Sequence, residues 1–518
     1  MEANVGVPSS GGTRILDGAC AVKRLYIFND KFGNDSDNEM GKVLYFHPPR
    51  TDEDTQLKQV GLSEAIIRFA TKFNTKLPCE SLHTQKTRVI FHTPESGYWF
   101  VLVLTIPSVK KHSPDGVEFV EYLGDEVQDD VFRAILEKLH KKFVLLNDTL
   151  EGIYKNNGLE ELCLRLKKFF DASVGKLDAS QCGLSDIFTG LQFFPLDRAM
   201  FLRIQCFINK LLLTWPSVKH VLLMQGDRLI WSGIEQSNIQ IFYDYLVNDL
   251  LSKHFLAGVD KQSTFGVICK RESHISLMQD DHCTRSTSFT SLYSNHPTSN
   301  STAMNTSVMS GSNNDADNAS FMTASTNTIN GKDEVPANTY KKFHMLIYKA
   351  EQTYLTLLVP DTEELARETV NKLEVFLNVN FTSMARQLAK VPSVNSHLSQ
   401  TAMSGCTSNS SMNEGIPPNV KFIYFNSLNL AERASPTIRC EIDAYKLLAD
   451  LRADLARTTE SGEITIKAIS ETWVVAKTAN GREFYAIFNQ TGGANVLDID
   501  EELRKLTDAQ LTNIFFQD

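Results

Sequence analysis

Several residues in this chain have side chains that ligate metals or transfer protons, but their spacing does not suit that chemistry. His274, His282 and Cys283 lie near one another, and Asp280 and Asp281 form a carboxylate pair among them. A protein metal site needs ligands at defined spacing on a rigid frame. These residues instead precede a segment rich in Ser, Thr and Asn, so we predict no metal site and no cofactor.

Motifs for nucleotide binding and nucleophilic catalysis are missing from the sequence. There is no GxxxxGK[ST], no GxGxxG after a strand and no GxSxG. The glycine pairs Gly11–Gly12 and Gly492–Gly493 lack the lysine or the helix start that a phosphate loop requires. We therefore expect no covalent enzyme chemistry, and an orphan hydrolase would need a nucleophile and base that we do not find. Function should then reside in surfaces.

Composition limits the kind of partner. At 518 residues the chain should hold roughly two to four domains. Its net charge of −10 argues against nucleic-acid binding, which needs a basic face to neutralise phosphates. No apolar run reaches the ~20 residues of a bilayer span, and the first residues do not resemble a signal peptide. Nine scattered cysteines without a CxxC pair indicate reduced thiols and a cytoplasmic location.

Two low-complexity stretches interrupt the chain. Residues 286–331 contain 27 Ser, Thr or Asn in 46 positions, too few large apolar side chains to offset the entropy of ordering. Residues 393–418 have a similar composition. We predict a disordered insertion at 272–338 inside a domain, and a helix followed by a disordered linker at 381–418.

The ordered parts repeat one pattern three times, in the order β-β-α-β-β-β-α. The last copy is the clearest, with strands at 419–426, near 436–440, and at 463–469, 472–478 and 483–489, and helices at about 442–457 and 497–514. The fold class should be α/β (α+β), with three five-stranded antiparallel sheets and flanking helices. The predicted domains are 20–150, 216–380 and 419–518, and bridging helices occupy 151–215.

The first copy contains the candidate interaction surfaces. The stretch "ESLHTQKTRVIF" at 80–91 predicts a hairpin with a polar edge strand that either is solvated or meets a partner. The helix at 51–74 has an apolar stripe of Leu62, Ile66, Phe69 and Phe73, which we assign to the core. Val60 and Ile67 fall off that stripe. They form a second seam that either contacts a partner or is covered by a helix at 158–172.

Basic pairs offer a weaker indication of a membrane-facing surface. Lys167 and Lys168 lie on a predicted helix, and Lys341 and Lys342 begin a predicted strand. Most such pairs belong to solvated faces. If they faced one anionic bilayer, each residue would contribute ~1 kcal/mol, enough to support recruitment but not stable anchoring.

The segments "KRLYIFN", "VGLSEAIIRFATKF" and above all "SLHTQKTRVIF" resemble the N-terminal region of the Ccz family, the calcium–caffeine–zinc-sensitivity vacuolar fusion proteins. The resemblance is specific over about residues 20–150. It implies three longin domains and a heterodimer with the Mon protein. That pair would be a guanine nucleotide exchange factor for the late-endosomal or vacuolar Rab GTPase. It also implies recruitment to phosphoinositide-containing endosomal, lysosomal or vacuolar and autophagosomal membranes, and in animals a third, propeller-containing subunit.

The resemblance also directs attention to particular segments, since the first-domain helix and third strand lie near partner and GTPase in the family. The corresponding residues in this sequence are Val60, Glu64, Ile67 and Arg68 on the helix and His83, Lys86 and Arg88 on the hairpin. None would be catalytic in the usual sense, because exchange requires no acid, base or nucleophile. A non-catalytic tether or adaptor in vesicle traffic remains the alternative, since longin domains serve that role too.

Overall fold

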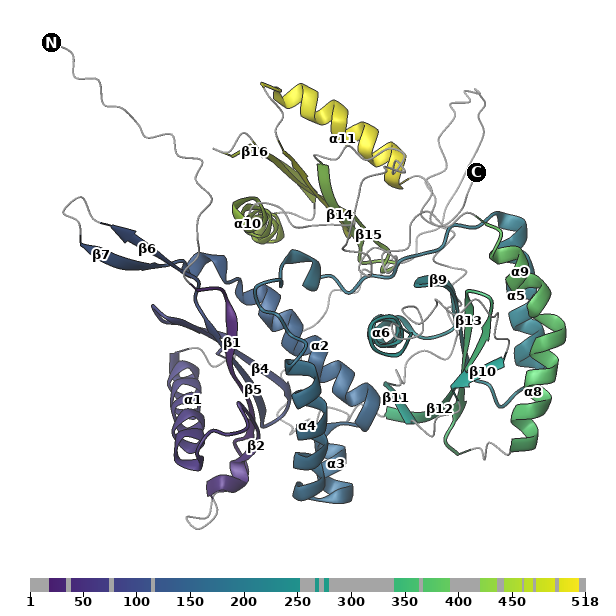
Figure 1. Ribbon diagram of the computed structural model, residues 1–518, viewed down its shortest axis with the longest axis horizontal. Coiled ribbons are helices and arrows are strands. Elements are labelled where there is room, and N and C mark those ends of the chain that lie inside the picture. The colour runs from purple at the N-terminus through teal and green to yellow at the C-terminus, as the bar shows by residue number, and fades with distance from the viewer. Residues whose placement is uncertain are drawn as a thin grey trace, which may run out of the picture.

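The computed structural model describes thirteen segments of the chain: residues 18–33, 39–73, 79–112, 117–251, 266–269, 274–278, 340–362, 367–391, 420–435, 442–458, 461–468, 472–489 and 493–511. The predicted fold class is confirmed: three antiparallel sheets are each flanked by helices (Figure 1). The predicted linker at 393–418 and the Ser-, Thr- and Asn-rich part of the predicted insertion lie outside these residues.

The first sheet has the order β2-β1-β5-β4-β3. Its strands are β1 (Ala21–Asn29), β2 (Val43–His47), β3 (Ser81–His83), β4 (Thr87–Glu95) and β5 (Tyr98–Thr105), and a short helical turn, η1 (Glu39–Lys42), precedes β2. Every residue of β5 except Thr105 is buried, because helices cover both faces of the sheet. The predicted polar insertion at 108–124 contains a hairpin of β6 (Ser108–His112) and β7 (Glu118–Tyr122), followed by the turn η2 (Gly124–Glu126).

Four helices pack around the first sheet. α1 (Glu53–Phe73) covers one face, and α2 (Asp129–Asn147) and α4 (Leu159–Val174) cover the other, with α3 (Leu150–Asn157) beside α4 (Figure 1). Phe143 and Phe170 pack among the sheet residues Tyr45 and Phe100. The idea that the helix near 158–172 covers the second seam of α1 is therefore wrong, because α4 lies on the opposite face.

The second sheet has the order β10-β12-β13-β8-β9, and β11 also pairs with β12. Its strands are β8 (His220–Gln225), β9 (Arg228–Ser232), β10 (Gly266–Cys269), β11 (His274–Met278), β12 (Tyr340–Ala350) and β13 (Thr353–Pro360). β11 lies within the predicted insertion at 272–338, so that boundary is wrong for these residues. Ile275 and Leu277 are buried there, an apolar alternation too short to stand out in the polar sequence around it.

Helices cover both faces of the second sheet. α5 (Arg198–Thr214), α8 (Arg367–Asn380) and α9 (Thr382–Leu388) pack on one face. α6 (Gln236–Asp244) packs on the other and continues as a π-helical segment, η4 (Tyr245–Leu251). The helix predicted at about 235–254 is thus two segments. Of the predicted bridging helices, α4 belongs to the first sheet and α5 to the second.

The third sheet has the order β15-β14-β18-β17-β16. Its strands are β14 (Val420–Asn426), β15 (Glu432–Ala434), β16 (Ser461–Lys467), β17 (Trp473–Ala479) and β18 (Arg482–Phe488), and its helices are α10 (Ile442–Thr458) and α11 (Val496–Leu511). The predicted Asn480–Gly481 hairpin turn is confirmed, with φ values of 50° and 72°. The second strand of this sheet is β15, and the predicted position at 436–440 lies outside the described residues.

A short extended segment joins the second and third sheets. It follows the turn η3 (Leu184–Asp186). Leu191 N–H donates to Leu430 C=O over 2.7 Å, and Phe194 N–H donates to Leu229 C=O over 2.9 Å. The segment thus forms backbone hydrogen bonds with both sheets. The second and third sheets also share one apolar core with α6 and α11. Lys138 and Lys142 of α2 bind Asp244 of α6 over 2.8 and 3.1 Å, which joins the first sheet's helix to the second sheet's.

Glu432 is partly buried at this junction, where its Oε2 accepts the Gly190 N–H over 2.8 Å. Only glycine fits at 190, since a Cβ there would lie 2.0 Å from the Glu432 Cβ. Burial raises the pKa of the Glu432 carboxyl to about 7, opposed by the Gly190 hydrogen bond and by Lys138. The unfolded carboxyl titrates near 4.5, so the folded state holds this proton over a wider pH range.

The Glu432 carboxyl should therefore make the protein less stable as pH rises from about 4.5 through about 7. Glu432→Gln keeps an acceptor for Gly190 but cannot ionise. We compare the unfolding free energy of Glu432→Gln with that of wild type at each pH. The difference in favour of the variant should be larger at pH 8 than at pH 4.5, by an amount on the order of 3 kcal/mol. Urea denaturation at several pH values measures this difference. The exposed Glu463→Gln serves as control, and equal pH profiles for Glu432→Gln and wild type would contradict the assignment.

Candidate functional site

The side of α1 that packs on the first sheet is narrow and contains a polar residue. Val60, Ser63 and Ile67 are 2%, 3% and 8% exposed. Ser63 Oγ lies 2.7 Å from the Tyr26 hydroxyl oxygen, which satisfies both buried hydroxyls. The prediction that Val60 and Ile67 form a surface seam is wrong, because both belong to the core between α1 and the sheet.

The opposite side of α1 carries large apolar side chains that the chain leaves in solvent. Leu62, Phe69 and Phe73 are 56%, 64% and 76% exposed, although the sequence assigned them to the core. The rings of Phe69 and Phe73 pack against each other with centroids 4.8 Å apart. We call Leu62, Phe69 and Phe73 the α1 outer face. Only Ile66 of the predicted core stripe is partly buried against the sheet.

The sheet explains why the side of α1 that is buried is not the one predicted from the sequence. Both apolar stripes recur every three or four residues, so helical spacing cannot rank them, and the larger side chains appear the better core residues. The sheet, however, presents its own aromatic residues to α1: Tyr26, Phe28, Phe46, Phe91 and Trp99. A close-packed layer that already holds these rings accepts the smaller side chains of α1. The larger ones then face outward.

A charged pair, Glu64 and Arg68, lies on a different side of α1 from the outer face. Glu64 binds Lys42 of η1 over 3.3 Å and Arg68 over 3.8 Å. The Glu64 side chain is 13% exposed and that of Arg68 is 70% exposed. Glu64 therefore holds α1 against the neighbouring turn, whereas the Arg68 side chain is exposed to solvent. Large apolar side chains left exposed at helical spacing, as on the α1 outer face, are typical of a site that meets another protein.

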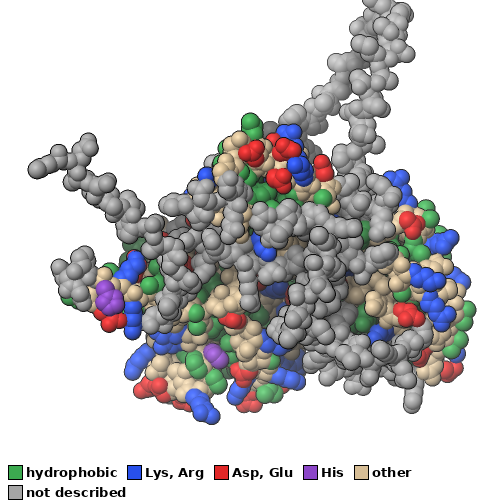
Figure 2. All heavy atoms as spheres, turned by 45° about the horizontal axis from the view of Figure 1, so that its top comes forward, with side chains coloured by type: hydrophobic (Ala, Val, Ile, Leu, Met, Phe, Trp, Pro, Cys, Tyr) green, Lys and Arg blue, Asp and Glu red, His purple; other side chains and the backbone are tan. Residues whose placement is uncertain are grey.

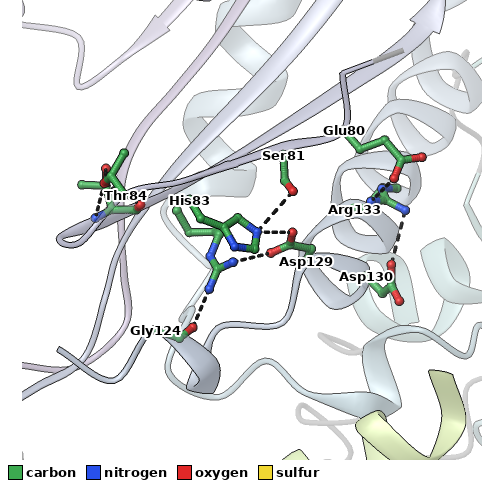
Figure 3. Close-up of polar contacts among 10 residues, drawn as sticks. Glu80, Ser81, His83, Thr84, Gly124, Asp129, Asp130 and Arg133 are labelled. Atoms are coloured by element: carbon green, nitrogen blue, oxygen red, sulfur yellow. Dashed lines mark hydrogen bonds and ion pairs between the residues drawn. The ribbon is translucent and has the colours of Figure 1, made fainter. Parts of the chain in front are cut away.

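The predicted hairpin at 80–91 is confirmed, with β3 as the edge strand of the sheet. Two of its side chains converge on Asp129, the first residue of α2 (Figure 3). His83 Nε2 lies 2.7 Å from Asp129 Oδ2, and Arg88 Nη1 lies 3.3 Å from Asp129 Oδ1. Arg88 Nη2 also donates to the Gly124 C=O over 2.5 Å. The edge of the sheet is thus tied to the start of α2.

Arg88 and His83 differ in how much of each side chain is exposed to solvent. The Arg88 side chain is 7% exposed and that of His83 is 59% exposed. Asp129 lies at the positive end of the α2 dipole, which favours its negative charge. A second link nearby joins Arg133 of α2 to Glu80 over 3.0 Å (Figure 3). We conclude that Arg88 anchors the hairpin, and that His83 is the member of this cluster that a partner can reach.

Lys86 occupies the turn of the hairpin, with its Nζ 6.0 Å from the centre of the Tyr122 ring at the base of the β6–β7 hairpin. The predicted residues therefore do not form one patch. Val60 and Ile67 are in the core on the α1 side, and His83 and Arg88 face α2 on the other side of the sheet. Sequence reasoning missed the α1 outer face, although the presence of two apolar stripes on one helix was its signal.

The predicted membrane-contacting lysines lie on different elements. Lys167 and Lys168 are exposed on α4, and Lys341 and Lys342 are exposed on β12. Lys342 Nζ binds Asp148 Oδ2 over 3.1 Å, which links the second sheet to the end of α2. Lys342 thus contributes to the packing of two parts of the chain. The acids Glu160, Glu161 and Asp171 share α4 with the other pair, which leaves that helix without excess positive charge.

Within the described segments, no three His, Cys, Asp or Glu side chains are grouped so that they could ligate a metal ion. His282, Cys283 and the Asp280–Asp281 pair fall outside those segments. The described helices also include none with the length and hydropathy of a membrane span.

Comparison with known proteins assigns the architecture. A family model described as the first longin domain of INTU, CCZ1 and HPS4 matches residues 22–148, and one described as INTU longin-like domain 3 matches 417–506. The vacuolar fusion protein CCZ1 homolog of Danio rerio is 31% identical over 507 residues, 95% of each chain. That of Xenopus tropicalis is 30% identical over 96% of this chain and 98% of its own. That of Dictyostelium discoideum is 26% identical over 93% and 95%. The chain is therefore a member of the CCZ1 family of vacuolar fusion proteins and contains longin domains.

Proposed function

We propose that this protein is one subunit of a heterodimeric guanine nucleotide exchange factor in vesicle traffic. Its partner is the longin-domain Mon protein, and its substrate is the late-endosomal or vacuolar Rab GTPase. The pair drives endosome maturation and the fusion of endosomes and autophagosomes with lysosomes or vacuoles. Family membership supports the trafficking role, and the exposed α1 outer face carries the proposal of a partner.

The α1 outer face suits a second longin domain. Two phenylalanines and a leucine with more than half of each side chain exposed lie on a helix that is otherwise well packed. Such side chains are the anchors of protein interfaces when a partner supplies a pocket for them. A partner helix laid along α1 would cover Leu62, Phe69 and Phe73 together. Arg68, whose side chain is 70% exposed on the same helix, would stay accessible to the GTPase, whereas His83 lies on the other side of the sheet.

Exchange activity needs surfaces of this kind and no catalytic side chain. A GTPase that binds nucleotide with nanomolar to picomolar affinity stores roughly 12–16 kcal/mol in that complex. The exchange factor must bind the empty GTPase much more tightly than the loaded one, because coupling between two ligands is reciprocal. Displacement of the switch segments and exclusion of Mg²⁺ accomplish this. No acid, base or nucleophile takes part.

Nucleotide release from a panel of Rab proteins tests the proposal. We expect this chain with its partner to accelerate release from the late-endosomal Rab at least 100-fold, and either subunit alone to have little effect. The alternative, a non-catalytic tether or adaptor, predicts equal affinity of the pair for loaded and empty GTPase and unchanged release. That result would replace the exchange-factor proposal with the alternative.

The proposal includes peripheral recruitment to phosphoinositide-containing membranes and, in animals, a third subunit with a propeller. Among the charged groups described above, Lys167, Lys168, Lys341 and Lys342 are the residues that sequence suggested for membrane contact. The proposal involves no nucleic acid and no resident cofactor.

A further inference from the structure

The helices on one face of the second sheet form a layer whose outer side carries an unusual charge. α5 lies beside α8 and α9 (Figure 1), with Arg203 Nη1 3.4 Å from Gln387 Oε1 and Lys210 Nζ 2.8 Å from Asn380 Oδ1. The inner sides of these helices are buried against the sheet through Ile204, Leu377 and other apolar residues. The outer side faces solvent.

The outer side of this layer is basic although the whole chain is acidic. α5 contains three basic residues and no acidic one, and neither α9 nor the three residues after it contain an acid. On α8, Lys372 is paired with Glu368 over 2.7 Å. The exposed cations of the layer outside α8 are Arg198, Arg203, Lys210, Arg386 and Lys390. In a chain of net charge −10, this is a local reversal of sign.

Exposed apolar side chains accompany these cations. Leu202 and Leu213 on α5 are 61% and 83% exposed, and Val375 and Val379 on α8 are 64% and 74% exposed. They recur at helical spacing on the same sides of their helices as the cations. Figure 2 shows hydrophobic and basic side chains, with a few acidic ones among them, at its right-hand side, where these helices lie in Figure 1. We call the exposed residues of α5, α8 and α9 the basic helical face.

We infer that the basic helical face binds the anionic surface of a lipid bilayer. The inference specifies a surface for the peripheral recruitment proposed above and rests on that proposal. Helices that lie on a membrane combine Lys and Arg with apolar side chains that enter the headgroup region. Long basic side chains keep their charge at the headgroups while their stems cover apolar surface. The charge is complementary to anionic lipid.

The basic helical face is a better candidate than the lysine pair on α4. That pair shares its helix with three acidic residues and has one exposed apolar neighbour, Leu164. Each cation near an anionic surface strengthens binding about fivefold, so a face with five cations and few acids has the larger effect. Lys342, moreover, is already engaged by Asp148.

Vesicle co-sedimentation of the full-length protein tests the inference. Vesicles of phosphatidylcholine with 30 mol% phosphatidylserine are compared with pure phosphatidylcholine. We expect Arg203→Gln with Lys210→Gln to weaken binding to the anionic vesicles roughly 30-fold. The matched control neutralises Arg457 and Arg504, which are 76% and 77% exposed on helices of the third sheet. We expect that control to bind like wild type.

A second pair of variants tests the apolar contribution without changing charge. Leu213→Ser should weaken vesicle binding about tenfold, while Leu497→Ser, at a residue that is 79% exposed on α11, should not. Both leucines are too exposed for a folding defect, and thermal denaturation verifies this.

The outcomes distinguish the surface from the recruitment proposal. If the wild-type protein does not bind anionic vesicles, both the membrane-binding face and the recruitment proposal are overturned. If wild type binds anionic vesicles and the Arg203, Lys210 and Leu213 variants bind equally well, only the assignment of binding to the basic helical face is overturned. Loss of wild-type vesicle binding when the partner subunit is added also overturns it, since a protein would then occupy the face. Nucleotide release without membranes should be the same for all these variants, so it tests the exchange proposal separately.

Discussion

Replacing Phe69 and Phe73 together by serine should abolish stable binding of the partner subunit and leave the protein folded. The two rings are 64% and 76% exposed and contact each other, so the unbound protein loses little when they are removed. An aromatic anchor at the centre of an interface commonly contributes 2 kcal/mol or more. We therefore expect at least a 100-fold loss of partner affinity, measured by calorimetry, and a similar loss of nucleotide release.

The matched control for this variant is Leu428→Ser with Leu497→Ser. These leucines are 55% and 79% exposed, and both lie in the third domain. Both double variants should unfold within about 0.5 kcal/mol of wild type. Partner binding that survives the Phe69 and Phe73 changes would show that α1 is not the partner surface. If the variant loses partner binding but nucleotide release is still accelerated, exchange activity does not require the partner to bind at α1.

Replacing Ile67 by aspartate should unfold the first domain. Ile67 is 8% exposed and packs with Val60 against the aromatic face of the sheet. The substitution loses about 1.5–3 kcal/mol of apolar burial and adds the larger cost of an unpaired buried charge. A total above about 4 kcal/mol is a large part of the stability of an ordinary domain. Urea denaturation should show this as a lower midpoint.

Leu62→Asp is the position-matched control, since it introduces the same charge five residues earlier on the same helix. Leu62 is 56% exposed, so we expect a change in stability of about 0.5 kcal/mol or less, with weaker partner binding. Ile67→Val should cost about 0.5–1.5 kcal/mol. An Ile67→Asp protein with wild-type stability would mean that Ile67 faces solvent and that the orientation of α1 is reversed.

The sequence determined most of the architecture. Its repeat β-β-α-β-β-β-α predicted the three main sheets, because alternating apolar residues and turn signals such as Asn480–Gly481 act over short distances. The first and third sheets have the predicted five strands, the second has six, and β6 and β7 form a further two-stranded sheet that was not predicted. It failed at β11 and β15. The first is five residues long and the second three, and strands this short are stabilised mainly by the neighbours with which they pair.

The hairpin at 80–91 shows how much of a candidate site local sequence patterns can predict. Sequence placed its edge strand, its turn and its apolar partner strand correctly, because these depend on residues next to one another. It did not reveal that Arg88 and His83 meet at Asp129, more than 40 positions away. That contact depends on where the start of α2 lies on the sheet, which only tertiary packing decides.

The orientation of α1 marks the same limit for function. The sequence by itself determined that the helix has two apolar stripes, and hence that something should cover the second one. Only the tertiary structure decided that Val60 and Ile67 face the sheet and that Leu62, Phe69 and Phe73 face outward. The physical reason is that helical periodicity specifies which residues share a side. The side that is buried depends on the shape of the surface it meets, and here that surface is already filled with aromatic rings.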